Sequence, residues 1–114
     1  MNRSHDTIHY KTRADRLAEL WAIMEGCLGK PIPEVDRHED VCNARALIYY
    51  RMLQEGFSNN GTAKVANKNA ATLLHATRNA AFYVTHPRMY PDEANLWHKF
   101  NQAIQDHDDA AVHA

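Results

Sequence analysis

Several features are scarce in this chain of 114 residues, and each scarcity excludes a class of protein. The two cysteines, Cys27 and Cys42, form no CxxC pair, so neither a disulfide scaffold nor a cysteine-based zinc site is expected. Glycine and proline number four each, too few for a fibrous or low-complexity chain. The apolar runs span only a few residues, whereas crossing a bilayer takes roughly 20, and residues 1–11 lack an apolar signal-peptide core. We therefore expect one soluble helical domain in the cytoplasm.

Recognisable catalytic and cofactor motifs are also missing. The eight histidines are scattered at spacings that match no metal motif, and the chain contains no GxxxxGK[ST] phosphate loop. The densest acidic group, Asp106, Asp108 and Asp109, lies in a segment expected to fray, away from any paired carboxylate or nucleophile. The sequence predicts a protein that is not an enzyme and needs no metal or cofactor.

The net charge of −1 argues at first against nucleic-acid binding, but the charges are unevenly distributed. Residues 41–88 carry six basic residues against one acidic residue, Glu55, a local charge of +5. The flanking segments must then carry −6. A basic centre between acidic ends is typical of a domain that presents one face to phosphates.

Apolar residues recur at helical spacing through most of the chain, without strand-like alternation. We expect a bundle of five or six helices between a flexible leader at 1–11 and a frayed tail at 107–114. The expected helices cover residues 12–28, 41–55, about 61–66, 69–85 and 92–106, with one further helical turn after Pro33. Asp40 is expected to cap the second helix, and Ser58 or Asn59 the short one. On the 69–85 helix the inward residues are expected to be Ala70, Leu73, Leu74, Thr77, Ala81 and Val84.

The segment 58–85 reads as a short helix, a turn at Asn67 and Lys68, and a longer helix with a polar outer face. This order is typical of a helix-turn-helix, whose second helix enters the DNA major groove. Short turns between helices also occur in every helical bundle, so the pattern gains weight from its residues. The candidate DNA-binding residues are Arg45, Lys64, Asn67, Lys68, Asn69, Ala71, Thr72, His75 and Arg78.

Simpler roles compete for several of these side chains. Lys64 and Lys68 can be solvated surface lysines, and Arg45 can pair with Asp40 or Glu55 instead of a phosphate. Asn69 can cap its helix instead of reading a base. His75 has no nucleophile or carboxylate spaced with it on the same helix, so a surface role is favoured over catalysis.

Residues 67–78, N-K-N-A-A-T-L-L-H-A-T-R, resemble the signature of the C-terminal domain of the bacterial replication initiator DnaA, commonly G-G-R-D-H-T-T-V-L-H-A-x-R. Lys68 matches the motif's first Arg, Thr72 its second Thr, and Arg78 its last Arg. Leu73 to Ala76 match V-L-H-A. Upstream, Val41, Arg45 and Leu47 resemble the family's V-x-x-x-R-x-M helix start. The resemblance covers about 12–104 and implies a Trp-repressor-like, all-helical fold that binds double-stranded DNA.

The chain departs from the family at the implied reading positions. Asn69, Ala70 and Ala71 stand where the family has Asp, His and Thr, so a different base sequence is expected. Residues 36–40 contain three acids where the family has an Arg-rich loop that reaches the minor groove. The family's ATPase motif is absent. The resemblance implies a stand-alone DNA-reading domain of a kind carried by a phage or mobile element. Its implied role is replication initiation or the regulation of that step. It would then be associated with the nucleoid and have replication proteins as further partners. The rival hypothesis is a helical protein-interaction domain that has lost DNA binding.

Overall fold

The computed structural model describes residues 12–113, and the leader predicted at 1–11 lies outside them. Five α-helices follow one another in the described part of the chain, which contains no strand. They are α2 (Arg13–Leu28), α3 (Glu39–Gln54), α4 (Asn59–Ala66), α5 (Ala70–Thr85) and α6 (Pro91–His113). The all-helical prediction is therefore confirmed. None of these helices combines the length and the apolar character that a membrane crossing requires.

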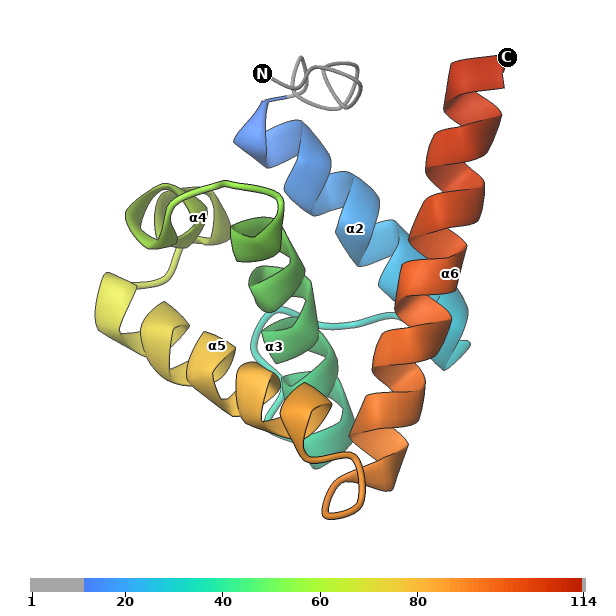
Figure 1. The fold of residues 1–114 in the computed structure, drawn as a ribbon. Coiled ribbons are helices and arrows are strands. Elements are labelled where there is room, and N and C mark those ends of the chain that lie inside the picture. Colours follow the sequence, from blue (N-terminus) through green and yellow to red (C-terminus); the bar gives the residue numbers. More distant parts are fainter. Residues whose placement is uncertain (1–11, 114) are drawn as a thin grey trace.

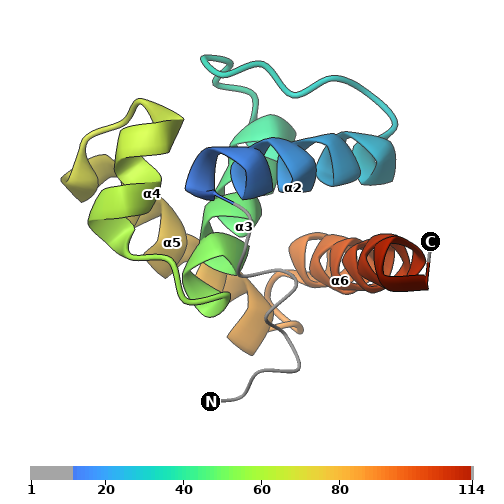
Figure 2. The same ribbon diagram turned by 90° about the horizontal axis from the view of Figure 1, so that it is seen from above.

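Helix α3 is the centre of the packing, because each of the other four helices contacts it. In Figure 1, α2 and α6 lie on one side of α3, and α4 and α5 on the other. Figure 2 shows α6 nearly along its axis, beside α2. The buried core joins residues from all five helices: Leu17, Leu20, Met24, Val41, Ala44, Leu47, Ile48, Met52, Ala63, Leu73, Ala80, Phe100 and Ile104.

The helix boundaries follow from local capping chemistry. The Thr12 side chain accepts a hydrogen bond from the Asp15 amide and caps α2, and Gly29 ends it at φ 74°. Helix α3 begins at Glu39, and its N-cap residue His38 makes no capping hydrogen bond through its side chain. The prediction that Asp40 caps this helix was wrong, because Asp40 already lies inside its first turn. Residues 34–35 form a turn, so the helical turn expected after Pro33 is absent from the described chain.

The C-terminal helix is longer than its sequence suggested. Helix α6 continues to His113, whereas the acid-rich sequence predicted an end near Asp106 and a frayed tail beyond it. Asp108 lies in this extension, and its carboxylate accepts two hydrogen bonds from Arg16 of α2 at 2.9 and 3.1 Å, which holds this part of α6 against α2. Arg16 is fully buried and also bonds Glu55, the C-cap residue of α3, at 2.7 and 2.8 Å. One guanidinium thus ties three helices together.

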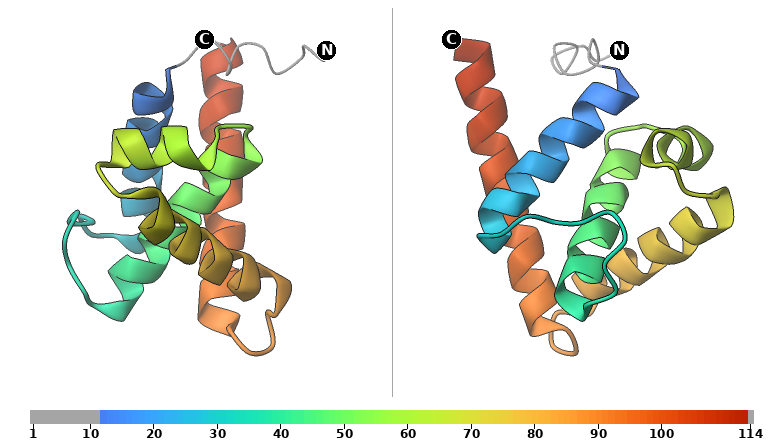
Figure 3. Two further views of the ribbon diagram at one scale, coloured as in Figure 1. Left: turned by 90° about the vertical axis from the view of Figure 1, so that its left-hand side faces the viewer. Right: turned by 180° about the vertical axis from the view of Figure 1, so that it is seen from behind.

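The connection between α2 and α3, residues 29–38, crosses the outside of the bundle in an extended form (Figure 3). The Trp21 indole donates to the Ile32 carbonyl oxygen at 3.0 Å, and the Ile32 amide donates to the Glu25 carboxylate at 2.8 Å. Ile32 is itself buried. These contacts fix the loop against α2 and bring its second half toward α5.

Candidate nucleic-acid interface

Helices α4 and α5 are joined by a tightly bonded turn. The Ser58 hydroxyl accepts from the Gly61 amide at 2.9 Å and begins α4. Asn67 ends α4 in the left-handed conformation at φ 57°, and the Lys68 amide donates to the Ala63 carbonyl at 2.9 Å. The Asn59 side chain then crosses to α5 and donates to the Ala70 carbonyl at 3.1 Å. The mutual orientation of the two helices is fixed by these bonds.

Asn69 is the N-cap of α5. Its side-chain oxygen accepts the Thr72 amide hydrogen at 2.7 Å. The capping hypothesis for Asn69 is therefore confirmed in the structure. The cap commits the Oδ1 atom to the backbone and leaves the Nδ2 donor as the group that can reach a ligand.

The outer face of α5 is set by what packs inward. Leu73, Thr77 and Ala80 are buried toward the bundle, where α5 packs against α3. Ala71, Thr72, His75 and Arg78 are all exposed, as expected for an outer face. Leu74 was predicted to point inward, but its side chain is 39% exposed. The helical wheel assigned too many apolar residues to the buried face of α5. An α-helix that is packed on one side buries only part of its circumference.

The charged residues of α4, the turn and α5 are all of one sign. Between Glu55 and Asp92 the chain has no Asp or Glu, while it has Lys64, Lys68, Arg78 and Arg88. The side chains of Lys64 and Arg78 are exposed, and no hydrogen bond or ion pair to another described residue engages them. An acid-free stretch that covers α4, the turn and α5 gives this face of the molecule a positive potential.

Two other predicted cations are held by the loop between α2 and α3. The Lys68 ammonium donates to the Glu34 carbonyl at 3.3 Å. Arg45 donates to the Pro33 carbonyl at 2.6 Å and also to the Asp36 carbonyl. The alternatives expected for Arg45 were wrong, because Asp40 pairs with Lys30, and Glu55 with Arg16 and Arg51. Arg45 serves chiefly to position the loop.

The carboxylates of this loop region are kept ionised by their neighbours. The backbone amide and then the side chain of His38 donate to Asp36, and these bonds lower the pKa of that carboxyl. The Lys30 ammonium binds Asp40 and likewise lowers its pKa. Negative charge therefore persists beside the N-terminal end of α3 at neutral pH.

A groove of about 250 Å³ runs between α3 and α5. Four of the predicted residues line it, namely Arg45, Lys68, Thr72 and His75. Sequence reasoning missed its far end, where the Tyr83 hydroxyl donates to the Asn43 side-chain oxygen at 3.1 Å. Nothing in the local sequence marks that bond, since its partners lie 40 residues apart. The nearest partner of the His75 ring is the Asn79 amide at 3.4 Å.

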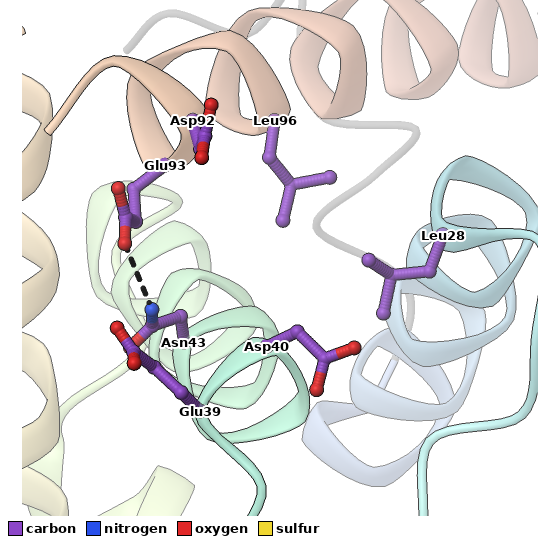
Figure 4. Close-up of a pocket in the computed structure, with 7 residues that line it drawn as sticks. All are labelled: Leu28, Glu39, Asp40, Asn43, Asp92, Glu93 and Leu96. Atoms are coloured by element: carbon purple, nitrogen blue, oxygen red, sulfur yellow. Dashed lines mark hydrogen bonds between the residues drawn. The ribbon is translucent and has the colours of Figure 1, made fainter.

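A second hollow, of about 500 Å³, lies where α2 ends and where α3 and α6 begin (Figure 4). It is lined by Leu28, Glu39, Asp40, Asn43, Asp92, Glu93 and Leu96. The Asn43 amide donates to Glu93 at 3.0 Å across it. The four carboxylates sit in the first turns of α3 and α6, where the helix dipole favours negative charge. This hollow contains none of the predicted DNA-binding residues.

The described residues hold one trio of potential metal ligands within 4.8 Å of one another: Glu19, His107 and Asp108. The Arg16 guanidinium donates to both carboxylates of this trio, at 2.6 Å to Glu19 and at 2.9 Å to Asp108. Burial alone would lower the pKa of Arg16, but its bonds to Glu55, Asp108 and Glu19 raise the pKa above the usual value. Arg16 thus already supplies the positive charge in this cluster.

Comparison of the chain with protein-family models, with curated proteins and with solved structures found no match.

Proposed function

We propose that this chain binds double-stranded DNA as a helix-turn-helix domain, with α4 and the turn supporting α5 in the major groove. It does so without enzymatic activity of its own, in replication initiation or its regulation. The observation that carries the proposal is the acid-free stretch of α4, the turn and α5, with exposed cations at Lys64 and Arg78. A polyanion is the partner that such a surface attracts.

The geometry of α4 and α5 supports this role. The major groove is about 12 Å wide and admits one α-helix. From its N-cap to its middle, α5 presents a series of exposed side chains: Asn69, Ala71, Leu74, His75 and Arg78. Because the Asn59 bond to Ala70 and the Asn67 turn fix α5 relative to α4, little ordering is required on binding.

The resemblance to the DnaA C-terminal domain accounts for the same segment, and its fold, its Trp-repressor-like helix-turn-helix and its replication role are part of this proposal. The loop at 29–38 lies next to the start of α5, since Glu34 binds Lys68. In this chain the loop region carries acids and occupies Lys68 and Arg45 through carbonyl oxygens. We therefore expect a dissociation constant in the micromolar range or higher. This binding is weaker than the Kd of ~10⁻⁸ M that is common for specific DNA binding.

The same loop contacts favour one alternative function. If Lys68 and Arg45 remain bonded to the loop, fewer cations reach phosphates, and the scaffold serves instead as a protein-interaction domain. The two functions differ in their response to duplex DNA and to salt.

The test is a fluorescence-anisotropy titration of labelled duplex DNA at low and increasing salt. With two or three phosphate contacts from Lys64, Arg78 and Lys68, log Kd should rise with log salt with a slope of about 2 to 3. The Arg78→Ala variant should lower that slope by about 1. Lys99→Ala is a charge-matched control on α6, where Lys99 bonds the Cys27 carbonyl, and it should leave the slope unchanged. Absence of binding to any duplex would refute the proposal and favour the interaction domain.

A further inference from the structure

Leu74 is an apolar residue on a face where the sequence predicted none. It is 39% exposed and lies outside the core cluster, because Leu73 and Thr77 take the inward positions on either side of it. Ala71 lies three residues before it and Arg78 four residues after it. Side chains at these spacings share one face of an α-helix, and all three are exposed.

A single exposed leucine is common on protein surfaces and needs no partner by itself. The surroundings of Leu74 restrict what that partner can be. The face carries the Arg78 guanidinium, Lys64 lies on the adjoining helix α4, and no acid occurs on either helix. A protein surface that matched these cations with acids would suit them, but a DNA major groove supplies both phosphates and an apolar group. That apolar group is the C5 methyl of thymine.

We propose that Leu74 is a specificity-determining residue that selects thymine through contact with its C5 methyl group. This inference rests on the proposed function, and it names the class of DNA that the helix reads. The Leu74 side chain has no polar atom, so it distinguishes bases by the methyl alone and not by hydrogen bonds. Arg78, one turn further along, supplies affinity through phosphate without sequence information.

The experiment begins with selection of bound duplexes from random DNA, followed by titration of the best site. Each thymine of that site is then replaced by deoxyuridine, which removes only the methyl group. Burial of one methyl corresponds to about 0.8 kcal/mol, or about a fourfold change in Kd. One thymine should therefore show about fourfold weaker binding when it is replaced, and Leu74→Ala should bind the thymine and uracil sites equally.

Matched measurements keep the outcomes separate. Val112→Ala truncates another exposed apolar residue, on α6, and should retain the full difference between thymine and uracil. Melting curves test that Leu74→Ala is folded. Selected sites without thymine, or the same thymine preference in wild type and Leu74→Ala, would overturn this inference while leaving DNA binding intact. Lack of binding to every duplex would instead refute the proposed function. Loss of a dimer on Leu74→Ala, seen by sedimentation, with equal weakening on both DNAs would assign Leu74 to contact between copies and also overturn it.

Discussion

Arg16 shows how a charged residue can organise a small core. Its side chain is fully buried and bonds three carboxylates, on Glu19, Glu55 and Asp108. A buried ion pair adds little to the free energy of unfolding when it is compared with apolar side chains of similar volume. Removal of one partner, however, leaves the remaining charges desolvated and unpaired. The cluster therefore connects α2, α3 and α6, and we expect the loss of any single member to be costly.

Replacement of Arg16 by Ala should lower the free energy of unfolding by about 3 to 5 kcal/mol, since three carboxylates lose their common partner. Urea unfolding followed by circular dichroism measures this change. Arg37→Ala, on an exposed loop residue, is the control and should change stability by less than about 0.5 kcal/mol. A cost for Arg16→Ala as small as that of the control would contradict the role assigned to the cluster.

Asn69 has two separable roles at the start of α5. The Asn69→Ala variant should lose the cap and about 1 kcal/mol of stability, because the Thr72 amide loses its acceptor. Asn69→Ser retains an oxygen for the cap but lacks the amide donor that remains free to reach a base. We expect Asn69→Ser to preserve the melting temperature and to weaken discrimination at one base position of a selected site. Unchanged selectivity in both variants would limit Asn69 to capping.

We expect Lys68 to contribute to the affinity for DNA, whereas Asn69 contributes to the choice of base. Phosphate contacts carry no sequence information, so loss of Lys68 should weaken all DNA sites alike. Its bond to the Glu34 carbonyl must break or lengthen for the ammonium to reach a phosphate. The contribution of Lys68 to the salt slope should therefore be smaller than that of Arg78, which no described residue binds.

At the scale of elements, much was predictable from local chemistry. Ser58 and Asn69 act as caps, Gly29 ends its helix with positive φ, and Asn67 makes the turn between α4 and α5. Such signals are local, since a cap or an αL residue affects only the next few backbone bonds. The order of helices and the segment that forms the candidate interface could therefore be found without a structure.

Long-range contacts limited the rest of the prediction. Arg16 looks like a solvated charge on an amphipathic helix, and its partners Glu55 and Asp108 lie 39 and 92 residues away. The acids near the C-terminus looked like a frayed tail for the same reason. Leu74 was placed inward because periodicity alone does not say which part of a wide apolar face packs against α3. The capture of Arg45 and Lys68 by loop carbonyls also depends on where the loop runs.

The turn at Asn67 gives a test at this scale. A residue at φ 57° is favourable for Gly and tolerable for Asn, whereas a β-branched residue is strained there. Asn67→Gly should leave stability within about 0.5 kcal/mol of wild type, and Asn67→Val should lower it by about 1 to 2 kcal/mol. Thermal melts monitored by circular dichroism provide the comparison. Equal melting temperatures for the two variants would mean that the turn does not hold α5 in place.

At the scale of the whole molecule, the charge is divided between faces. The acid-free stretch covers α4 and α5, while the carboxylates of Glu39, Asp40, Asp92 and Glu93 gather around the hollow between α3 and α6. A net charge of −1 hides this separation. The acidic hollow adjoins the C-terminal half of α5, since the Tyr83 hydroxyl donates to Asn43, which also lines the hollow. If the chain binds DNA as proposed, a duplex should therefore approach the N-terminal end of α5, away from these acids. We expect the same division of charge to keep the non-specific affinity for DNA low.

DNA reading by α4 and α5 can be observed directly in a ¹⁵N-¹H correlation spectrum of the folded protein, titrated with a short duplex at low salt. If α4 and α5 contact DNA, the amides of residues 58–78 should shift progressively, together with the Arg78 side chain. The amides around the hollow at Asp92 and Glu93 should stay unchanged, and all shifts should reverse on addition of salt. Shifts confined to the α3 and α6 side, or no shift at any DNA concentration, would contradict the assignment of α4 and α5 as the DNA-reading surface.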